Sequence, residues 1–195
     1  MRDAGIGRLL VASLHQGIAD RLPDRLEFYE NWLNPRGLRD GTIGLAPLHA
    51  VLSFLRTEGG DYARVTTTAG EYAAQWAVGE LPSLRRWAAT RLPGALRRRV
   101  ALGVARTLIT RAYTGSRTHL ALRKTTGTLE IKSSIFCGVR ERVPNPLCQF
   151  HAAAIARVLA ELDIPARTTI VACQATGDRA CRVEINMSGA SEERA

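Results

Sequence analysis

The chain has 195 residues, 46% of them hydrophobic and 23% charged, a balance that predicts a globular chain and excludes a disordered one. Lys and Arg total 27 against 18 Asp and Glu, so the formal net charge is +9. No apolar run is as long as a membrane span, and the N-terminal stretch, interrupted by Arg8, makes a poor signal peptide. We therefore expect a cytoplasmic protein with no membrane span.

Apolar residues in the first two-thirds of the chain recur at helical spacing. This pattern predicts helices over residues 5–22 and 24–33, from about Pro47 to Gly59-Gly60, over 61–79, and through a basic region, broken by Pro82 and Pro93, to about Ala112. Residues 35–44 hold three glycines, and we expect a loop or a short extended piece there.

The pattern changes after Gly115, where Thr, Leu and Ile begin to alternate with polar residues. It predicts strands over 118–125 and 128–136 with a turn at Thr126-Gly127, a helix over 146–162, and strands over 167–174 and 180–187. This ββ-α-ββ order behind a helical front predicts an α/β (α+β) fold with helices packed on a mainly antiparallel four-stranded sheet. We expect one domain over 1–187, with a helical extension over 1–44, a core over 45–187 and a disordered tail over 188–195.

Positive charge is concentrated in one segment. Between Leu84 and Ala112 the chain has no acidic residue and eight arginines: Arg85, Arg86, Arg91, Arg97, Arg98, Arg99, Arg106 and Arg111. Such a segment attracts phosphates, nucleic acid, an acidic protein surface or a carboxylated ligand, although it is equally typical of a solvated helix face. No helix-turn-helix pattern accompanies it and aromatic residues are only 6%, which argues against nucleic acid as the partner.

The four cysteines, Cys137, Cys148, Cys173 and Cys181, all lie in the last third of the chain. In the last hairpin, two of them stand four residues before and four residues after Gly177, so they should lie opposite each other on the inner face, which Cys173 shares with Val171. Alternation along 128–136 extends to Cys137 and places it on the same inner face. The Asn145-Pro146 helix start brings Cys148 to the same end of the sheet.

Four converging thiols have several chemical interpretations. They could be buried and inert, because free cysteine is often buried. A Cys173–Cys181 disulfide fits the hairpin but is disfavoured in a reducing cytoplasm. A tetrahedral zinc site suits four thiolates, and an iron–sulfur cluster is a further alternative.

Two motifs carry a resemblance to a known family. Residues 146–151 read Pro-Leu-Cys-Gln-Phe-His, and residues 172–183 contain Cys-Gln-Ala-Thr-Gly-Asp-Arg-Ala-Cys followed by an alternating strand. Together they resemble the 4-vinyl reductase domain family, and the resemblance covers about 45–187. It implies a fold similar to the trafficking-complex subunits of the TRAPP type, and a homodimer paired through its helices.

The resemblance also implies a function. The family includes ligand-sensing domains of aromatic-responsive regulators and a bacteriochlorophyll-biosynthesis protein named a 4-vinyl reductase. This chain resembles the pigment branch more closely, which implies binding or delivery of a tetrapyrrole intermediate of photosynthetic pigment synthesis and a biosynthetic enzyme as a possible partner. The regulator-type domains bind zinc through three cysteines and a glutamate, but Ile170 stands at the glutamate position here, so Cys137 would have to supply the fourth ligand.

No nucleotide-cofactor motif supports catalysis by this chain alone. Gly5-x-Gly7 lacks the third glycine of a dinucleotide fingerprint and follows no strand, so neither NAD nor flavin binding is indicated, and whether the chain is an enzyme stays open. A pocket between the helices and the sheet is the preferred hypothesis, and it would hold a small hydrophobic anion such as a tetrapyrrole, a fatty acid or an aromatic acid. The residues expected to line it are Trp87, Arg97, Arg98, Arg99, Tyr113, His119 and His151. The alternative function is a cytoplasmic sensor module that binds a small aromatic or lipid-like signal and docks on a partner protein.

Overall fold

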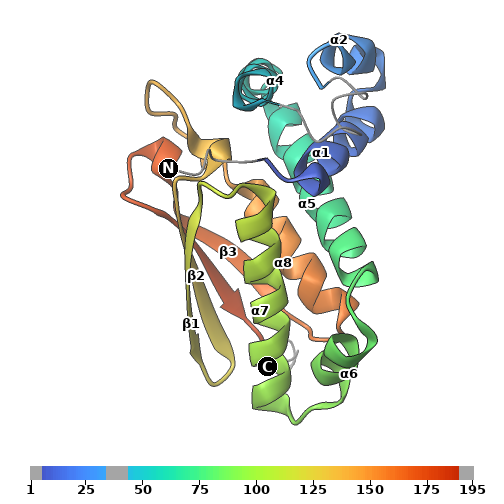
Figure 1. The fold of residues 1–195 in the computed structure, drawn as a ribbon. Coiled ribbons are helices and arrows are strands. Elements are labelled where there is room, and N and C mark those ends of the chain that lie inside the picture. Colours follow the sequence, from blue (N-terminus) through green and yellow to red (C-terminus); the bar gives the residue numbers. More distant parts are fainter. Residues whose placement is uncertain (1–5, 34–43, 189–195) are drawn as a thin grey trace, which may run out of the picture.

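The computed structural model describes residues 6–33 and 44–188, in which helices pack on one face of a four-stranded antiparallel sheet with the order β1-β2-β4-β3 (Figure 1). The helices are α1 (Arg8–Arg21), α2 (Leu26–Glu30), α4 (Leu45–Thr57), α5 (Gly60–Gly79), α6 (Ser83–Arg91), α7 (Gly94–Ala112) and α8 (Gln149–Glu161). The strands are β1 (Arg117–Arg123), β2 (Thr126–Lys132), β3 (Arg167–Ala172) and β4 (Cys181–Asn186). Short 3-10 turns are η1 (Pro23–Arg25), η2 (Ile135–Cys137) and η3 (Gln174–Thr176). The predicted α+β fold with a mainly antiparallel four-stranded sheet is confirmed.

Proline divides the basic region as the sequence indicates. Pro82 and Pro93 are the N-cap residues of α6 and α7, because proline lacks the N–H that a helix interior needs. The second helix is shorter than predicted and ends at Glu30. The loop predicted over 35–44 and the tail predicted over 188–195 lie, except for Gly44 and Ser188, outside the described residues.

The β1–β2 turn is not where the sequence pattern placed it. Arg123 pairs with Thr126, so the turn is formed by Lys124, which has a φ of 46°, and Thr125. Gly127 therefore lies inside β2, where a Cβ would stand 3.3 Å from Leu102 Cδ1 of α7. The prediction of a turn at Thr126-Gly127 was wrong because this glycine serves close helix–sheet packing instead of chain reversal.

Helix α5 is the centre of the helical layer, packed against α1 on one side and α8 on the other (Figure 1). Glycines make both contacts close: a Cβ on Gly17 would lie 2.7 Å from the Val65 carbonyl oxygen, and a Cβ on Gly70 would lie 3.1 Å from Ala153 Cβ. These approaches fix the position of α8 and hence of the cysteine at its start. In the described part of the chain, no helix combines the length and apolar character that a membrane span requires.

Candidate functional site

The four cysteine sulfurs converge on one point, all within 4.8 Å of one another. Each comes from a different local structure: Cys137 ends η2, Cys148 is the N-cap of α8, Cys173 follows β3 and Cys181 begins β4. All four side chains are buried and none forms a disulfide. Cys137 Sγ lies 3.4 Å from Cys173 Sγ and 3.4 Å from Cys181 Sγ. The geometry therefore matches the predicted convergence at one end of the sheet.

The last hairpin places its two cysteines by strand register. Ala172 pairs with Arg182, so the next position inward sets Cys173 beside Cys181, as the turn at Gly177 predicts. The register shifts between Ile170 and Ala172, and this bulge turns Val171 to solvent with 45% of its surface exposed. The expectation that Val171 shares the inner face with Cys173 was therefore wrong.

Cys137 reaches the centre by a route that strand alternation does not describe. Strand β2 ends at Lys132, and Ser133 takes a positive φ of 58° before the η2 turn. Alternation from Ile131 through Ile135 to Cys137 was therefore the wrong reason for a correct location. The turn itself is fixed by Arg56, whose Nη2 donates to the Phe136 carbonyl oxygen at 3.0 Å.

Backbone N–H groups donate to two of the sulfurs. The N–H of Leu147 lies 3.3 Å from Cys173 Sγ, and the N–H of Gln174 lies 3.4 Å from Cys181 Sγ. Such donors favour the charged form of a thiol. Asp178 supports the same hairpin by accepting the Cys173 N–H at 2.9 Å. The centre is thus built to hold negative charge on sulfur.

Mutual contact separates the pKa values of the thiols. Hydrogen bonds from the neighbouring thiols, Cys137 first, together with the Leu147 N–H, hold the pKa of Cys173 well below its usual range. The same contacts, again with Cys137 first, raise the pKa of Cys148. Four neighbouring thiols cannot all ionise without a counter-charge, so a divalent cation at their centre would complete the electrostatics.

His151 is buried beside this centre. Its Nε2 lies 2.9 Å from Ser134 Oγ, and its ring makes edge contacts with Phe136 and Phe150. Nδ1 is buried without a hydrogen-bond partner among the described residues. Burial lowers the pKa of the imidazole from 6.5 to about 4, against a smaller opposing effect of Cys173. His151 is therefore a neutral residue at the edge of the core.

This burial predicts a pH-dependent stability. As the pH falls below 6.5, an unfolded chain takes up the proton that the folded imidazole accepts only near pH 4. The free energy of unfolding should therefore fall between pH 6.5 and 4, by up to about 3 kcal/mol from this group. Urea unfolding of wild type and His151→Gln at both ends of this range isolates the effect, and an equal pH dependence in the two proteins would contradict it.

The other residues predicted to line a ligand pocket are not gathered in one place. Trp87 is 55% exposed on α6, and His119 is exposed on β1. Arg97 Nη2 donates to the carbonyl oxygens of Leu162 and Asp163 just past α8, at 2.6 and 2.9 Å. Arg98 Nε donates to the Lys124 carbonyl oxygen, Arg99 is exposed, and Tyr113 is half-buried at the other end of α7.

A cavity of about 450 Å³ lies instead among four helices. Leu9 of α1, Ala77 of α5, and Val104 and Leu108 of α7 are among its apolar lining residues. Its charged lining residues are Arg8, Arg85, Arg111 and Glu80. Within the described part of the chain, these four side chains form no ion pair or hydrogen bond. The cavity thus has an excess of two unpaired positive charges over an apolar wall.

The N-terminal segment closes this cavity. Gly7 donates its N–H to the Ala112 carbonyl oxygen at 3.0 Å, and Ile6 bridges to Tyr113. This contact brings Arg8 beside the end of α7, where Arg111 lies. Sequence reasoning noted Arg8 only as an interruption of an apolar stretch, because nothing in the local pattern reveals a pairing more than 100 residues away.

Residues 128–187 match the family model of the 4-vinyl reductase domain. The matched range contains all four cysteines and most of the sheet, and it supports the resemblance that the two sequence motifs carry. The bacteriochlorophyll branch, the homodimer and the cytoplasmic location stay predictions. No curated protein matches the chain in sequence.

Solved structures with a similar fold include sensory proteins. The phenol-responsive sensory domain of the transcription activator PoxR, solved with phenol, has a TM-score of 0.53 at 11% identity, covering 74% of each chain. An H-NOX protein from S. oneidensis in the Fe(II)NO ligation state gives 0.59 at 11% identity, covering 93% of this chain and 99% of that one. An Fe(II) unliganded mutant of an H-NOX protein from K. algicida gives 0.56 at 11% identity over 93% and 96%. At this identity the likeness concerns the fold alone.

Proposed function

We propose that this chain is a small-molecule-binding sensor module with a structural zinc ion held by Cys137, Cys148, Cys173 and Cys181. In this proposal the zinc fixes the start of α8 to the last hairpin, and the ligand occupies the cavity lined by α1, α5, α6 and α7. The observation that carries the binding function is the apolar cavity with three unpaired guanidinium groups. The match to the 4-vinyl reductase domain and the fold shared with sensory domains agree with it.

The sulfur geometry supports a single tetrahedral ion. Zinc bonds to thiolate at about 2.3 Å, which places four sulfurs at tetrahedral corners about 3.8 Å apart. The observed sulfurs, all within 4.8 Å of one another, fit that size after small adjustments. An iron–sulfur cluster distributes its cysteines over several iron atoms and needs a wider set of sulfurs. Four protein ligands leave no open coordination position, so such a zinc would stabilise the fold and take no part in catalysis.

Cavity chemistry indicates the class of ligand. Three unpaired arginines favour an anion, and Arg pairs with carboxylates in a bidentate manner. Glu80 is the one acid in the lining, and it disfavours a ligand with several negative charges. The leucines and Ala77 favour an apolar body, and the cavity volume lies within the range of small-molecule sites. An aromatic or aliphatic monocarboxylate meets these requirements.

The pigment hypothesis is a second candidate, supported by the family match over the cysteine-containing region. It requires a tetrapyrrole with propionates to enter the same cavity. Spectral titration with Mg-protoporphyrin IX distinguishes the two: a shift that depends on the cavity arginines favours a pigment carrier, whereas no shift together with tight monocarboxylate binding favours a sensor.

Calorimetric titration of the zinc-loaded protein with dodecanoate and with 2-naphthoate tests the proposed site. Neutralising Arg8, Arg85 and Arg111 together to Gln should weaken binding at least about tenfold and reduce its salt dependence, because the guanidinium–carboxylate attraction is lost. The matched control neutralises Arg91, Arg99 and Arg123, which lie outside the cavity lining and remove the same charge. Equal loss in both triple variants would contradict the assigned cavity and indicate only a general effect of charge.

A further inference from the structure

Large apolar side chains are exposed within the acid-free arginine segment. Leu84 and Trp87 of α6 are 77% and 55% exposed, and Leu96 in the first turn of α7 is 50% exposed. Leu84 and Trp87 are three residues apart and so lie on one face of their helix. Burial in this chain would normally cover such residues, so their exposure marks a surface with a partner.

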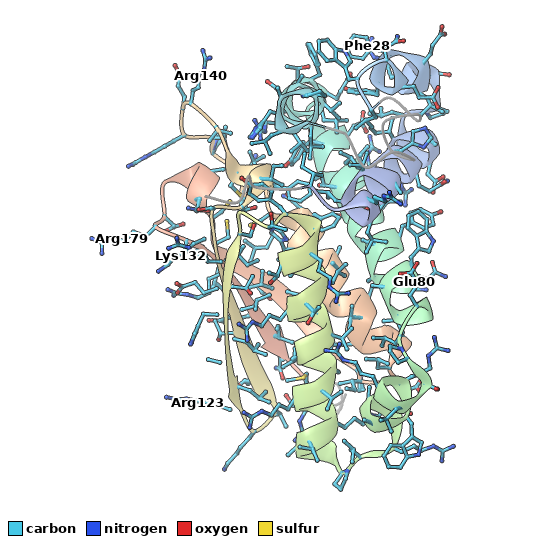
Figure 2. All side chains as sticks on the ribbon, in the orientation of Figure 1. Phe28, Glu80, Arg123, Lys132, Arg140 and Arg179 are labelled. Carbon is cyan, nitrogen blue, oxygen red and sulfur yellow. The ribbon has the colours of Figure 1, made fainter. Side chains whose placement is uncertain are left out.

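These residues belong to one end of the molecule. Arg97 Nε donates to the Ala89 carbonyl oxygen at 3.2 Å and joins the start of α7 to α6. Arg98 Nε donates to the Lys124 carbonyl oxygen at 3.1 Å and joins it to the β1–β2 turn. Figure 1 shows α6, the start of α7 and this turn at the end of the molecule opposite η2 and η3, and Figure 2 shows Arg123 projecting from it. We call this surface the basic end, formed by Leu84, Trp87, Arg91, Leu96, Arg99, Arg123 and Lys124.

The charge of the basic end is strongly positive and uncompensated. The guanidinium groups of Arg91, Arg99 and Arg123 make no ion pair or hydrogen bond with any residue in the described ranges. Two acids lie nearby in the chain, Glu80 before α6 and Asp163 beside Arg97, and neither is paired with these arginines. The surface therefore attracts anions over an area that also presents Trp and Leu.

We propose that the basic end docks on the surface of an anionic lipid bilayer, with Trp87, Leu84 and Leu96 entering the interfacial region. A nucleic acid would be bound by the arginines but gives the two leucines no apolar environment, whereas a bilayer surface accommodates both groups. Trp is also the residue that membrane interfaces favour most clearly. Docking at the interface needs no membrane-spanning helix, and it does not depend on the ligand proposed for the helical cavity.

Co-sedimentation of the zinc-loaded full chain with vesicles tests this docking. Vesicles of phosphatidylcholine with about one-third phosphatidylglycerol should bind the protein at low salt, and phosphatidylcholine alone should bind it weakly, because each arginine near an anionic surface contributes about fivefold. Neutralising Arg91, Arg99 and Arg123 to Gln should weaken partitioning at least tenfold. Changing both Leu84 and Trp87 to Ser should also weaken it, and the loss should persist at low salt.

Matched controls separate docking from general electrostatics. Neutralising Lys132, Arg140 and Arg179, which Figure 2 shows away from the basic end, removes the same charge and should leave partitioning within about twofold. Trp32→Ser removes an exposed aromatic residue near the far end of the helical layer and should have no effect. Equal losses in the two charge triples would overturn the proposal. So would a basic-end triple that loses affinity for a fluorescent DNA duplex while its vesicle binding is unchanged.

Discussion

Cys173→Ser is expected to release the bound metal and to lower the free energy of unfolding by several kcal/mol, on the order of 3–5, because a closed zinc site contributes its binding energy directly to folding. The sulfur it removes contacts Cys137 Sγ and accepts the Leu147 N–H, so the change also frees the loop before α8. Cys137→Ser should have the same effect, although the residue belongs to a 3-10 turn and Ile170 occupies the position of the family's glutamate.

Chelator provides the internal control for this prediction, because all four cysteines of the chain belong to the site. A strong zinc chelator should lower the urea midpoint of wild type to about that of Cys173→Ser and should leave the variant unchanged. Elemental analysis of the reduced wild type should find one zinc per chain. A wild-type midpoint that chelator does not move, in a protein that still contains zinc, would place the metal elsewhere.

Gly70→Ala is expected to destabilise the fold by about 2–3 kcal/mol, because the added methyl would overlap the Phe150 carbonyl oxygen and press on Ala153 Cβ, forcing α5 away from α8. The matched control is Gly103→Ala in the middle of α7, where a Cβ would meet nothing within 4 Å. That change should stabilise the protein by up to about 1 kcal/mol, since alanine has the higher helix propensity.

Thermal and urea unfolding of both glycine variants measure these opposite effects. Because α8 begins at Cys148, moving α8 should also weaken zinc retention in Gly70→Ala, and the Gly103 variant should retain zinc fully. A Gly70 variant as stable as the Gly103 variant would show that the α5–α8 contact is looser than the structure has it.

The cysteine centre could be predicted from the sequence because two of its determinants are local. Counting from Gly177 sets Cys173 opposite Cys181 in any regular hairpin, and Asn145-Pro146 marks a helix start beside Cys148. The bulge that exposes Val171 and the positive φ at Ser133 are not visible in the sequence, since neither position carries the glycine that usually marks such geometry. Tertiary contacts decide them.

The ligand cavity could not be predicted in the same way. Its lining comes from three segments far apart in the chain, and they meet only because Gly7 bonds to the end of α7. The helix–sheet interface where the pocket was expected is filled by Leu102 against Gly127. Arg97, predicted as a ligand residue, donates instead to carbonyl groups that the end of α8 leaves unsatisfied.

Blocking the helical cavity tests the proposed function most directly. Ala77→Trp places an indole in the space proposed for the ligand, whereas Gln75→Trp adds the same side chain at an exposed position of the same helix. Calorimetric titration with dodecanoate, on variants first shown to retain zinc and wild-type unfolding midpoints, should find binding to wild type and Gln75→Trp and at least about a hundredfold loss in Ala77→Trp. Binding of undiminished affinity to Ala77→Trp would contradict a ligand site among these helices.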